Sequence, residues 1–160
     1  MTLPKQFDIN EWFLIGTSLL MIVIFFSLQR RFAYVQVVVI LVINFFLAAV
    51  LDNILAGPPL DLYDVMDRPE FGYMDFFTYI FVYPLTAYVV VYYYDKWQVN
   101  KQWLFWYVIG CAGVALGLER LSSLFHVFSY NHWPIYGSLI VYFLSYFLNI
   151  MIFHFTKKYI

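Results

Sequence analysis

Five long apolar runs dominate this sequence and restrict what it can fold into. In hydrocarbon every backbone N–H and C=O group needs an internal partner, so an apolar run of about 20 residues crosses a membrane as an α-helix. The composition agrees, because 64% of the residues are hydrophobic and only 12% are charged. The sequence predicts an all-α integral membrane protein that forms one transmembrane domain over residues 1–160, with spans at about 12–28, 32–56, 76–94, 103–125 and 135–155.

The positive charges determine the expected orientation of these spans. Cytoplasmic loops carry an excess of Lys and Arg, and five spans place the following residues on one side: Arg30, Arg31, Lys96, Lys101, Lys157 and Lys158. The other side receives Lys5 and Arg68, with Arg120 near it. We therefore expect a cytoplasmic C-terminus and an external N-terminus. No internal repeat is apparent, and an odd number of spans argues against a simple transporter made of two halves.

The connection between the second and third spans, residues 57–75, is expected to be an acidic external loop. Gly57-Pro58-Pro59 ends the preceding helix, and Arg68 is the one basic residue among five acids: Asp61, Asp64, Asp67, Glu70 and Asp75. The apolar residues between the acids favour a short interfacial helix over residues 60–66. Because the acids lack the spacing of a calcium loop, we expect a solvated loop, with a cation site as the alternative.

The fourth span carries two adjacent charged residues, Glu119 and Arg120. Ionisable side chains cost about 2.5–3.5 kcal/mol at membrane depth, so they usually face a protein interior, water or a partner charge. Successive residues of a helix point about 100° apart, which gives each of the two side chains its own surroundings. The alternative is that both lie near the end of the helix and extend to the headgroup region, where they pair with loop charges.

The predicted topology brings further polar residues to the external ends of the helices. We expect one outward-facing polar cluster that can bind a ligand, formed by Asp52, Asn53, Asp75, Glu119, Arg120, His126, Tyr130 and His132. Within this cluster, Arg120 is expected to neutralise Asp52 or Asp75. Glu119 is expected to contact His126. A purely structural role, in which these groups only fix how the helices pack, stays open.

Small residues in the fourth span suggest a packing surface. Gly113 and Gly117 form a GxxxG pattern, which lets a neighbouring backbone approach closely. The pattern fits an internal packing face, or a seam in a homo-oligomer or larger membrane complex. Membrane lipid is a further expected partner. The single Cys111 cannot form an intramolecular disulfide, and we expect no cofactor, metal or nucleic acid because the sequence lacks their usual motifs.

Several local motifs resemble one known family. They are Tyr94-Asp95-Lys96-Trp97, Glu119, the turn at Val127–Trp133 and Tyr136-Gly137-Ser138. From about residue 70 onward, the chain is similar to a family of small uncharacterised membrane proteins of endospore-forming Firmicutes, named after a clostridial hypothetical protein. It departs from the family pattern at Pro134 and Gly137. The resemblance implies a protein of about five spans in a bacterial cytoplasmic membrane, and it implies no activity.

These observations favour a non-enzymatic role, the binding of a lipid, a small ligand or a partner membrane protein. A transporter or channel subunit for a cation or small solute is the alternative, with Pro84, Asp52 and Glu119 as its moving and conducting elements. A second alternative is a lipid- or isoprenoid-modifying enzyme that uses Glu119 as acid or base, with His126 or Tyr130 as its partner. This alternative rests on a distant similarity to small membrane enzymes of carotenoid metabolism, whose fuller acidic motifs this chain lacks.

Overall fold

The computed structural model describes residues 7–66 and 72–159 of the protein. Its described part contains five helices that are long and apolar enough to cross a membrane, as the sequence predicts. The third of these helices, over Tyr73–Lys96, consists of α3 (Tyr73–Phe77), the π-helical turn η1 (Thr78–Val82) and α4 (Tyr83–Lys96). The other four are α1 (Ile9–Ser27), α2 (Tyr34–Leu55), α5 (Lys101–Leu124) and α6 (Ile135–Tyr159).

A wide helical turn accommodates the proline in the third helix. Pro84 has no N–H to donate, and its ring would clash with the carbonyl group four residues earlier in a regular α-helix. Immediately before it, η1 widens the helix, so that the N–H of Tyr83 donates to the carbonyl oxygen of Thr78. The helix therefore continues through Pro84, whose side chain is buried.

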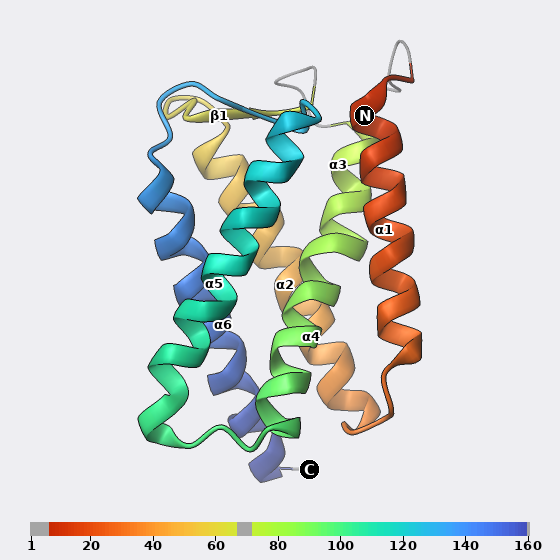
Figure 1. Cartoon of the computed structure of the whole chain (residues 1–160), viewed down its shortest axis with the longest axis vertical. Helices are drawn as coiled ribbons and strands as arrows, with labels where there is room; N and C mark the ends of the chain where they lie inside the picture. The colour runs from red at the N-terminus through yellow and green to blue at the C-terminus, as the bar shows by residue number, and fades with distance from the viewer. Residues whose placement is uncertain (1–6, 67–71, 160) are drawn as a thin grey trace.

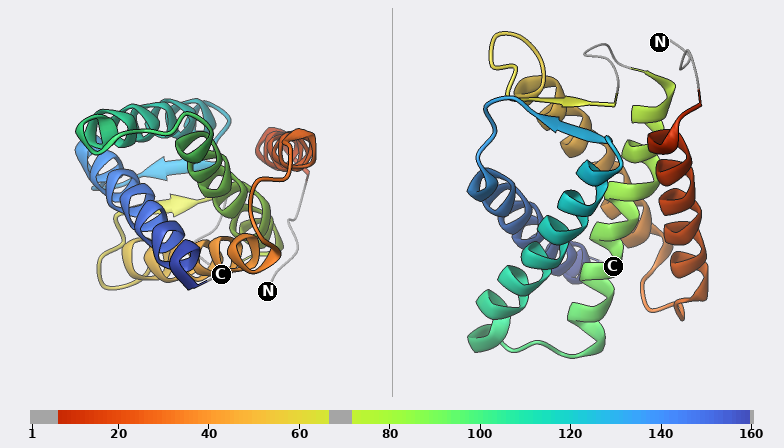
Figure 2. Two further views of the ribbon diagram at one scale, coloured as in Figure 1. Left: turned by 90° about the horizontal axis from the view of Figure 1, so that it is seen from below. Right: turned by 45° about the horizontal axis from the view of Figure 1, so that its top comes forward.

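Four helices surround a common interior, and α1 lies outside them. α2 packs against α4, α5 packs against α6, and α6 also contacts both α2 and α4. Viewed along their axes, these four helices enclose the middle of the molecule (Figure 2, left). α1 packs against α3, η1 and α4 on the outside of this group (Figure 1). Side chains that point into the four-helix group are therefore shielded from the surroundings of the molecule.

Two short strands lie across one end of the four-helix group (Figures 1 and 2). β1 (Tyr63–Val65) pairs antiparallel with β2 (Phe128–Tyr130), and the register places Tyr63 opposite Tyr130. The pairing extends beyond the strands, because the N–H of Met66 donates to the carbonyl oxygen of Val127 at 2.8 Å. We call this end of the bundle the strand end.

The strands correct one prediction for the acidic loop. The interfacial helix expected over residues 60–66 is wrong, because the backbone there finds its hydrogen-bond partners in the distant segment around β2 instead of within its own turn. Side chains of a strand alternate between two faces, so Tyr63 and Val65 share the face toward the helices. Asp67, Arg68 and Glu70 of the predicted loop lie outside the described residues.

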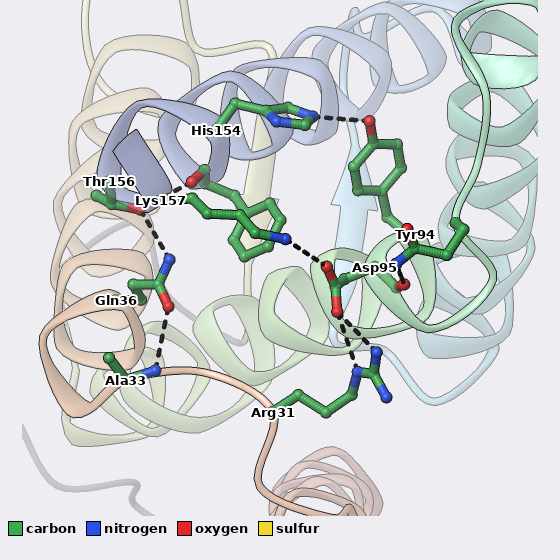
Figure 3. A network of polar contacts seen from close by, with 10 residues as sticks. Arg31, Ala33, Gln36, Tyr94, Asp95, His154, Thr156 and Lys157 are labelled. Atoms are coloured by element: carbon green, nitrogen blue, oxygen red, sulfur yellow. Dashed lines mark hydrogen bonds and ion pairs between the residues drawn. The ribbon is translucent and has the colours of Figure 1, made fainter. Parts of the chain in front are cut away.

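Ion pairs tie three helix ends together at the opposite end of the bundle (Figure 3). Asp95, near the end of α4, accepts a hydrogen bond from Arg31 Nη2 at 2.9 Å and another from Lys157 Nζ at 3.2 Å. Arg31 lies between α1 and α2, and Lys157 lies near the end of α6. We call this end the basic end, because the topology gathers there the basic residues of the predicted cytoplasmic side: Arg30, Arg31, Lys96, Lys101, Lys157 and Lys158.

Replacing Asp95 with Asn should lower the free energy of unfolding by about 1 kcal/mol, the upper range for exposed ion pairs. The substitution removes the negative charge that holds Arg31 and Lys157 together. Thermal unfolding in detergent measures the effect, which should shrink in about 1 M salt because salt screens exposed charges. The matched control is Asp61→Asn, an exposed acid at the strand end. A loss that does not depend on salt would contradict the ion-pair explanation.

An amide pair joins α2 to α6 near the middle of both helices. Asn44 Nδ2 donates to Asn149 Oδ1 at 2.6 Å, and Asn149 Nδ2 donates back to Asn44 Oδ1 at 2.9 Å. Both side chains are buried, and one turn closer to the basic end the buried Ile40 and Phe153 belong to one apolar cluster. Because buried polar groups need partners, the reciprocal pair fixes the position of α2 along α6.

The GxxxG pattern does not pack inside the molecule. Gly113 and Gly117 are exposed on α5, and a Cβ atom built on either glycine would meet nothing within 4 Å. Of the two roles predicted for this pattern, the internal packing face is therefore wrong. A seam in an oligomer stays a prediction.

Candidate functional site

Three hydroxyl groups surround the carboxylate of Glu119 at the strand end. Its Oε1 accepts hydrogen bonds from Tyr130 Oη at 2.6 Å and Ser138 Oγ at 2.8 Å. Its Oε2 accepts a third from Tyr142 Oη at 2.7 Å. Glu119 is buried, with 9% of its surface exposed, and faces the start of α6. Both carboxylate oxygens are thus satisfied by neutral donors.

Trp133 holds one of these donors in place. Its indole Nε1 donates to Ser138 Oγ at 2.7 Å, and the Ser138 hydroxyl in turn donates a hydrogen bond to Glu119. The indole ring packs directly over Gly137, where an added Cβ atom would lie 2.9 Å from the ring. A residue without a side chain is therefore required at position 137 for the observed position of Trp133.

Tyr130 connects the two adjacent charged residues of α5. Its hydroxyl binds Glu119, and the Arg120 guanidinium carbon lies 4.3 Å from the centre of its ring. Burial first, and then the Glu119 carboxylate, raise the pKa of Tyr130 above its ordinary value, so the phenol stays protonated and donates. Arg120 was expected to neutralise Asp52 or Asp75, and this prediction is wrong. Its guanidinium group lies over the Tyr130 ring instead. Within residues 7–66 and 72–159, the acid that forms ion pairs is Asp95.

A second tyrosine binds the acid of α2. Tyr63 Oη donates to Asp52 Oδ1 at 2.5 Å, and both residues are buried. Burial and then the charge of Asp52 raise the pKa of Tyr63 far above its ordinary value, which keeps this phenol protonated as well. Tyr79 of η1 also interacts with the Asp52 carboxylate. Asp52 is thus built into the interior of the bundle beneath β1.

Asp75 is the third buried acid at the strand end, with 6% of its surface exposed. Its Oδ2 accepts a hydrogen bond from the N–H of Gly72 at 2.8 Å, which caps the start of α3. In the described part of the chain, Asp75 Oδ1 and Asp52 Oδ2 are both buried and have no hydrogen-bond partner, and the same is true of Arg120 Nε.

Three of the predicted cluster residues do not join these groups. His126 and His132 have exposed side chains, so the expected contact between Glu119 and His126 is wrong. His126 follows the end of α5 with a left-handed backbone, φ 59°, which turns the chain away before β2 begins. Asn53 is exposed and donates to the carbonyl oxygen of Ala49 in its own helix at 2.6 Å. Asp52, Asp75, Glu119, Arg120 and Tyr130 therefore remain as the candidate site.

Sequence reasoning missed Tyr63, Tyr79, Ser138 and Tyr142. Two signals could have found most of them. Two of the three acids are followed eleven residues later by a tyrosine that binds them, in the pairs Asp52–Tyr63 and Glu119–Tyr130. Ser138 and Tyr142 are four residues apart, a spacing that puts both on one face of a helix.

The chain is thus a helical protein with five helices of membrane-spanning composition and a buried cluster of carboxylates and hydroxyls at one end. No group of three or more His, Cys, Asp or Glu residues in the described ranges could hold a metal ion. No protein-family model matches the chain, and no curated protein or solved structure is significantly similar to it. The resemblance to the Firmicutes family stays a prediction.

Proposed function

We propose that this chain is a multi-pass protein of a bacterial cytoplasmic membrane that binds a protonated amino group at its strand end. The amino group belongs to a lipid headgroup or to a small ligand. The strand end and the N-terminus face outward, and the basic end faces the cytoplasm. The gathering of Lys and Arg residues at one end of the bundle supports this orientation.

This proposal rests on two buried carboxyl oxygens that have no hydrogen-bond partner among the described residues. A buried acceptor that lacks a hydrogen bond costs about 1–3 kcal/mol, and such atoms in a folded protein call for a specific explanation. Asp52 Oδ2 and Asp75 Oδ1 are two such acceptors at the same end of the bundle. Both oxygens belong to carboxyl groups, whose ionised form burial disfavours unless a positive charge lies nearby. A bound ammonium group could donate to both oxygens, and its single positive charge would offset one carboxylate charge.

A protonated amine fits these surroundings better than a bare cation. An ammonium group supplies three N–H donors, and it is attracted to the faces of aromatic rings. Tyr63 and Tyr79 supply such rings next to Asp52. Metal ions, in contrast, are usually held by more oxygen ligands than the two carboxylates provide. The ligand class is therefore an organic amine.

The side chains in the middle of the bundle favour ligand binding over transport as the function. The amide groups of Asn44 and Asn149 satisfy each other there, and the buried Ile40, Ile150 and Phe153 fill the next turn toward the basic end. These side chains separate the acids of the strand end from the ion pairs of the basic end. Acids at one end of the bundle without a polar path to the other end favour binding over transport.

Ethanolamine added to the detergent-solubilised protein should raise its thermal unfolding temperature, because a ligand that binds the folded state stabilises it. Asp52→Asn and Asp75→Asn should each weaken this effect at least about tenfold in apparent affinity, which corresponds to about 1.4 kcal/mol. The matched control is Asp64→Asn, an acid on the outward face of β1 that binds Asn131, and it should respond like the wild type. An equal response of the wild type and both site variants would overturn the proposal.

Native mass spectrometry separates the two sources of the amine. The purified protein is incubated with phosphatidylethanolamine or with phosphatidylglycerol, which has no amino group. If the ligand is a lipid headgroup, phosphatidylethanolamine should stay bound to the wild type and be lost from Asp52→Asn. If the ligand is a small free amine, ethanolamine should stabilise the protein while neither lipid is retained selectively.

A further inference from the structure

The two strands that cover the candidate site come from different parts of the chain. β1 follows α2 and leads toward α3, whereas β2 connects α5 to α6. Each strand therefore belongs to its own helical hairpin, one formed by α2 and the third helix and the other by α5 and α6. The strands meet over the strand end (Figure 2, right). The line along which they pair is a seam between the two hairpins.

The tyrosine hydrogen bonds hold each strand on its own hairpin. Tyr63 of β1 binds Asp52 of α2, and Tyr130 of β2 binds Glu119 of α5. These two tyrosines are opposite each other across the seam, yet neither hydroxyl bond crosses it. The strands can therefore move apart with both tyrosine–carboxylate bonds intact.

Backbone hydrogen bonds and ring contacts join the two sides of the seam. Besides the three-residue ladder, the N–H group of Met66 donates across it to Val127, and those of Asn131 and His132 donate to Leu62. The Tyr63 ring contacts the rings of Phe128 and Trp133 on the other side. The Asn131 side chain also donates to Asp64 Oδ2 at 3.0 Å, on the exposed side. A two-stranded ribbon is marginally stable by itself in water. Among the described residues no ion pair crosses the seam, so the two hairpins are joined there by a short ribbon and its neighbouring contacts.

Strained backbone flanks both strands. Three residues other than glycine have a left-handed conformation there: Asp61 before β1 (φ 44°), Met66 after β1 (φ 60°) and His126 before β2 (φ 59°). This conformation costs roughly 1–2 kcal/mol per residue, and it persists only where the surrounding structure holds it. Asp61 and His126 lie in local turns that follow α2 and α5, where the N–H of Asp61 donates to Gly57 and that of His126 to Ser123. The N–H of Met66 donates across the seam to Val127, so separation of the strands releases the strain at Met66 and offsets part of the loss of pairing.

We propose that β1 and β2 form a two-part lid, which separates along the seam to admit the amine to Asp52 and Asp75 and pairs again over it. The identity of the ligand rests on the function proposed above. The motion of the lid rests on the seam between the hairpins, the tyrosine bonds and the strain at Met66.

A disulfide across the seam tests the lid. Asp64 and Ser129 are partners in the ladder and lie on its outward face. Cα atoms of such partners are about 4.5–5.5 Å apart in a regular ladder, which is within the range that a disulfide spans. The variant Asp64→Cys/Ser129→Cys is made in a Cys111→Ser background, because Cys111 is the single native cysteine.

Oxidation of this variant should slow the association of ethanolamine at least about tenfold, and a reductant should restore the rate. Amide hydrogen exchange of Met66 and Asn131 should slow by a similar factor in the oxidised protein, since these N–H groups open only when the seam opens. Asp64→Cys/Cys111→Ser, treated with the same oxidant, controls for the loss of the Asp64 side chain.

Two results would contradict the proposal that the strands form a lid. One is an unchanged rate of association in the oxidised protein. The other is exchange of Met66 and Asn131 that is equal in the oxidised and reduced proteins. If the reduced protein does not bind ethanolamine at all, the proposed function fails, and the exchange comparison alone decides whether the lid opens.

Discussion

Glu119→Gln should lower the thermal unfolding temperature of the detergent-solubilised protein by about 5–10 °C. The Glu119 carboxylate accepts three hydroxyl hydrogen bonds, whereas the amide nitrogen of Gln can only donate. At least one hydroxyl then faces another donor in a buried place. Losing a hydrogen bond to a charged group costs about 1.5–3 kcal/mol, and 1 kcal/mol shifts the unfolding temperature by about 2–4 °C in a domain of this size.

Two further variants make this result specific. Tyr142→Phe removes a single donor and should cost less than Glu119→Gln. Asp64→Asn changes an acid on the outward side of the strands, which accepts from Asn131, and should stay close to the wild type. Ethanolamine binding should survive in folded Glu119→Gln, because the oxygens proposed to bind the amine belong to Asp52 and Asp75. A wild-type unfolding temperature in Glu119→Gln would show that the three hydroxyls do not depend on the carboxylate.

Asn149→Leu should destabilise the protein by about 1–2 kcal/mol, the upper range for polar contacts between membrane helices. Leu has the same branching and number of side-chain heavy atoms as Asn, but it leaves Asn44 Oδ1 without its donor in a buried place. Adding Asn44→Leu should then recover much of the loss, because two apolar side chains leave no amide unpaired. Denaturant titration of the two single variants and the double variant in detergent gives the coupling between the two positions.

The matched control for this cycle is Asn53→Leu. Asn53 lies on the same helix as Asn44, is exposed and hydrogen bonds only to its own helix among the described residues. Its replacement should change the free energy of unfolding by less than about 0.5 kcal/mol. If the double variant is as unstable as the sum of the single variants, the reciprocal amide pair is not what joins α2 to α6.

The five long helices could be predicted because they follow from local properties. Length and hydropathy locate each apolar run, and the observed helices differ from the predicted spans by a few residues at their ends. The strands could not be predicted in the same way. Residues 63–65 and 128–130 become strands only because they meet each other, and a pairing between such distant segments leaves little trace in either segment alone.

The acids of the candidate site could be predicted, but the residues that form hydrogen bonds with them could not. Asp52, Asp75 and Glu119 are buried at the same end, as the topology suggested. The prediction paired Arg120 with Asp52 or Asp75, and it placed His126 in contact with Glu119. Instead, phenol and serine hydroxyls satisfy Glu119, and Arg120 stacks on an aromatic ring. Tyrosines are so frequent in this sequence that the donors could not be told apart from interfacial or packing residues by residue type.

The short distance along the chain between each acid and its tyrosine has a consequence for biosynthesis. Asp52 and Tyr63, like Glu119 and Tyr130, are eleven residues apart, so each bond can form as soon as its own hairpin leaves the ribosome and inserts. The Asn44–Asn149 pair spans 105 residues and needs the last helix. The order of synthesis therefore completes the two hairpins separately, and the amide pair and the strand pairing join them at the end.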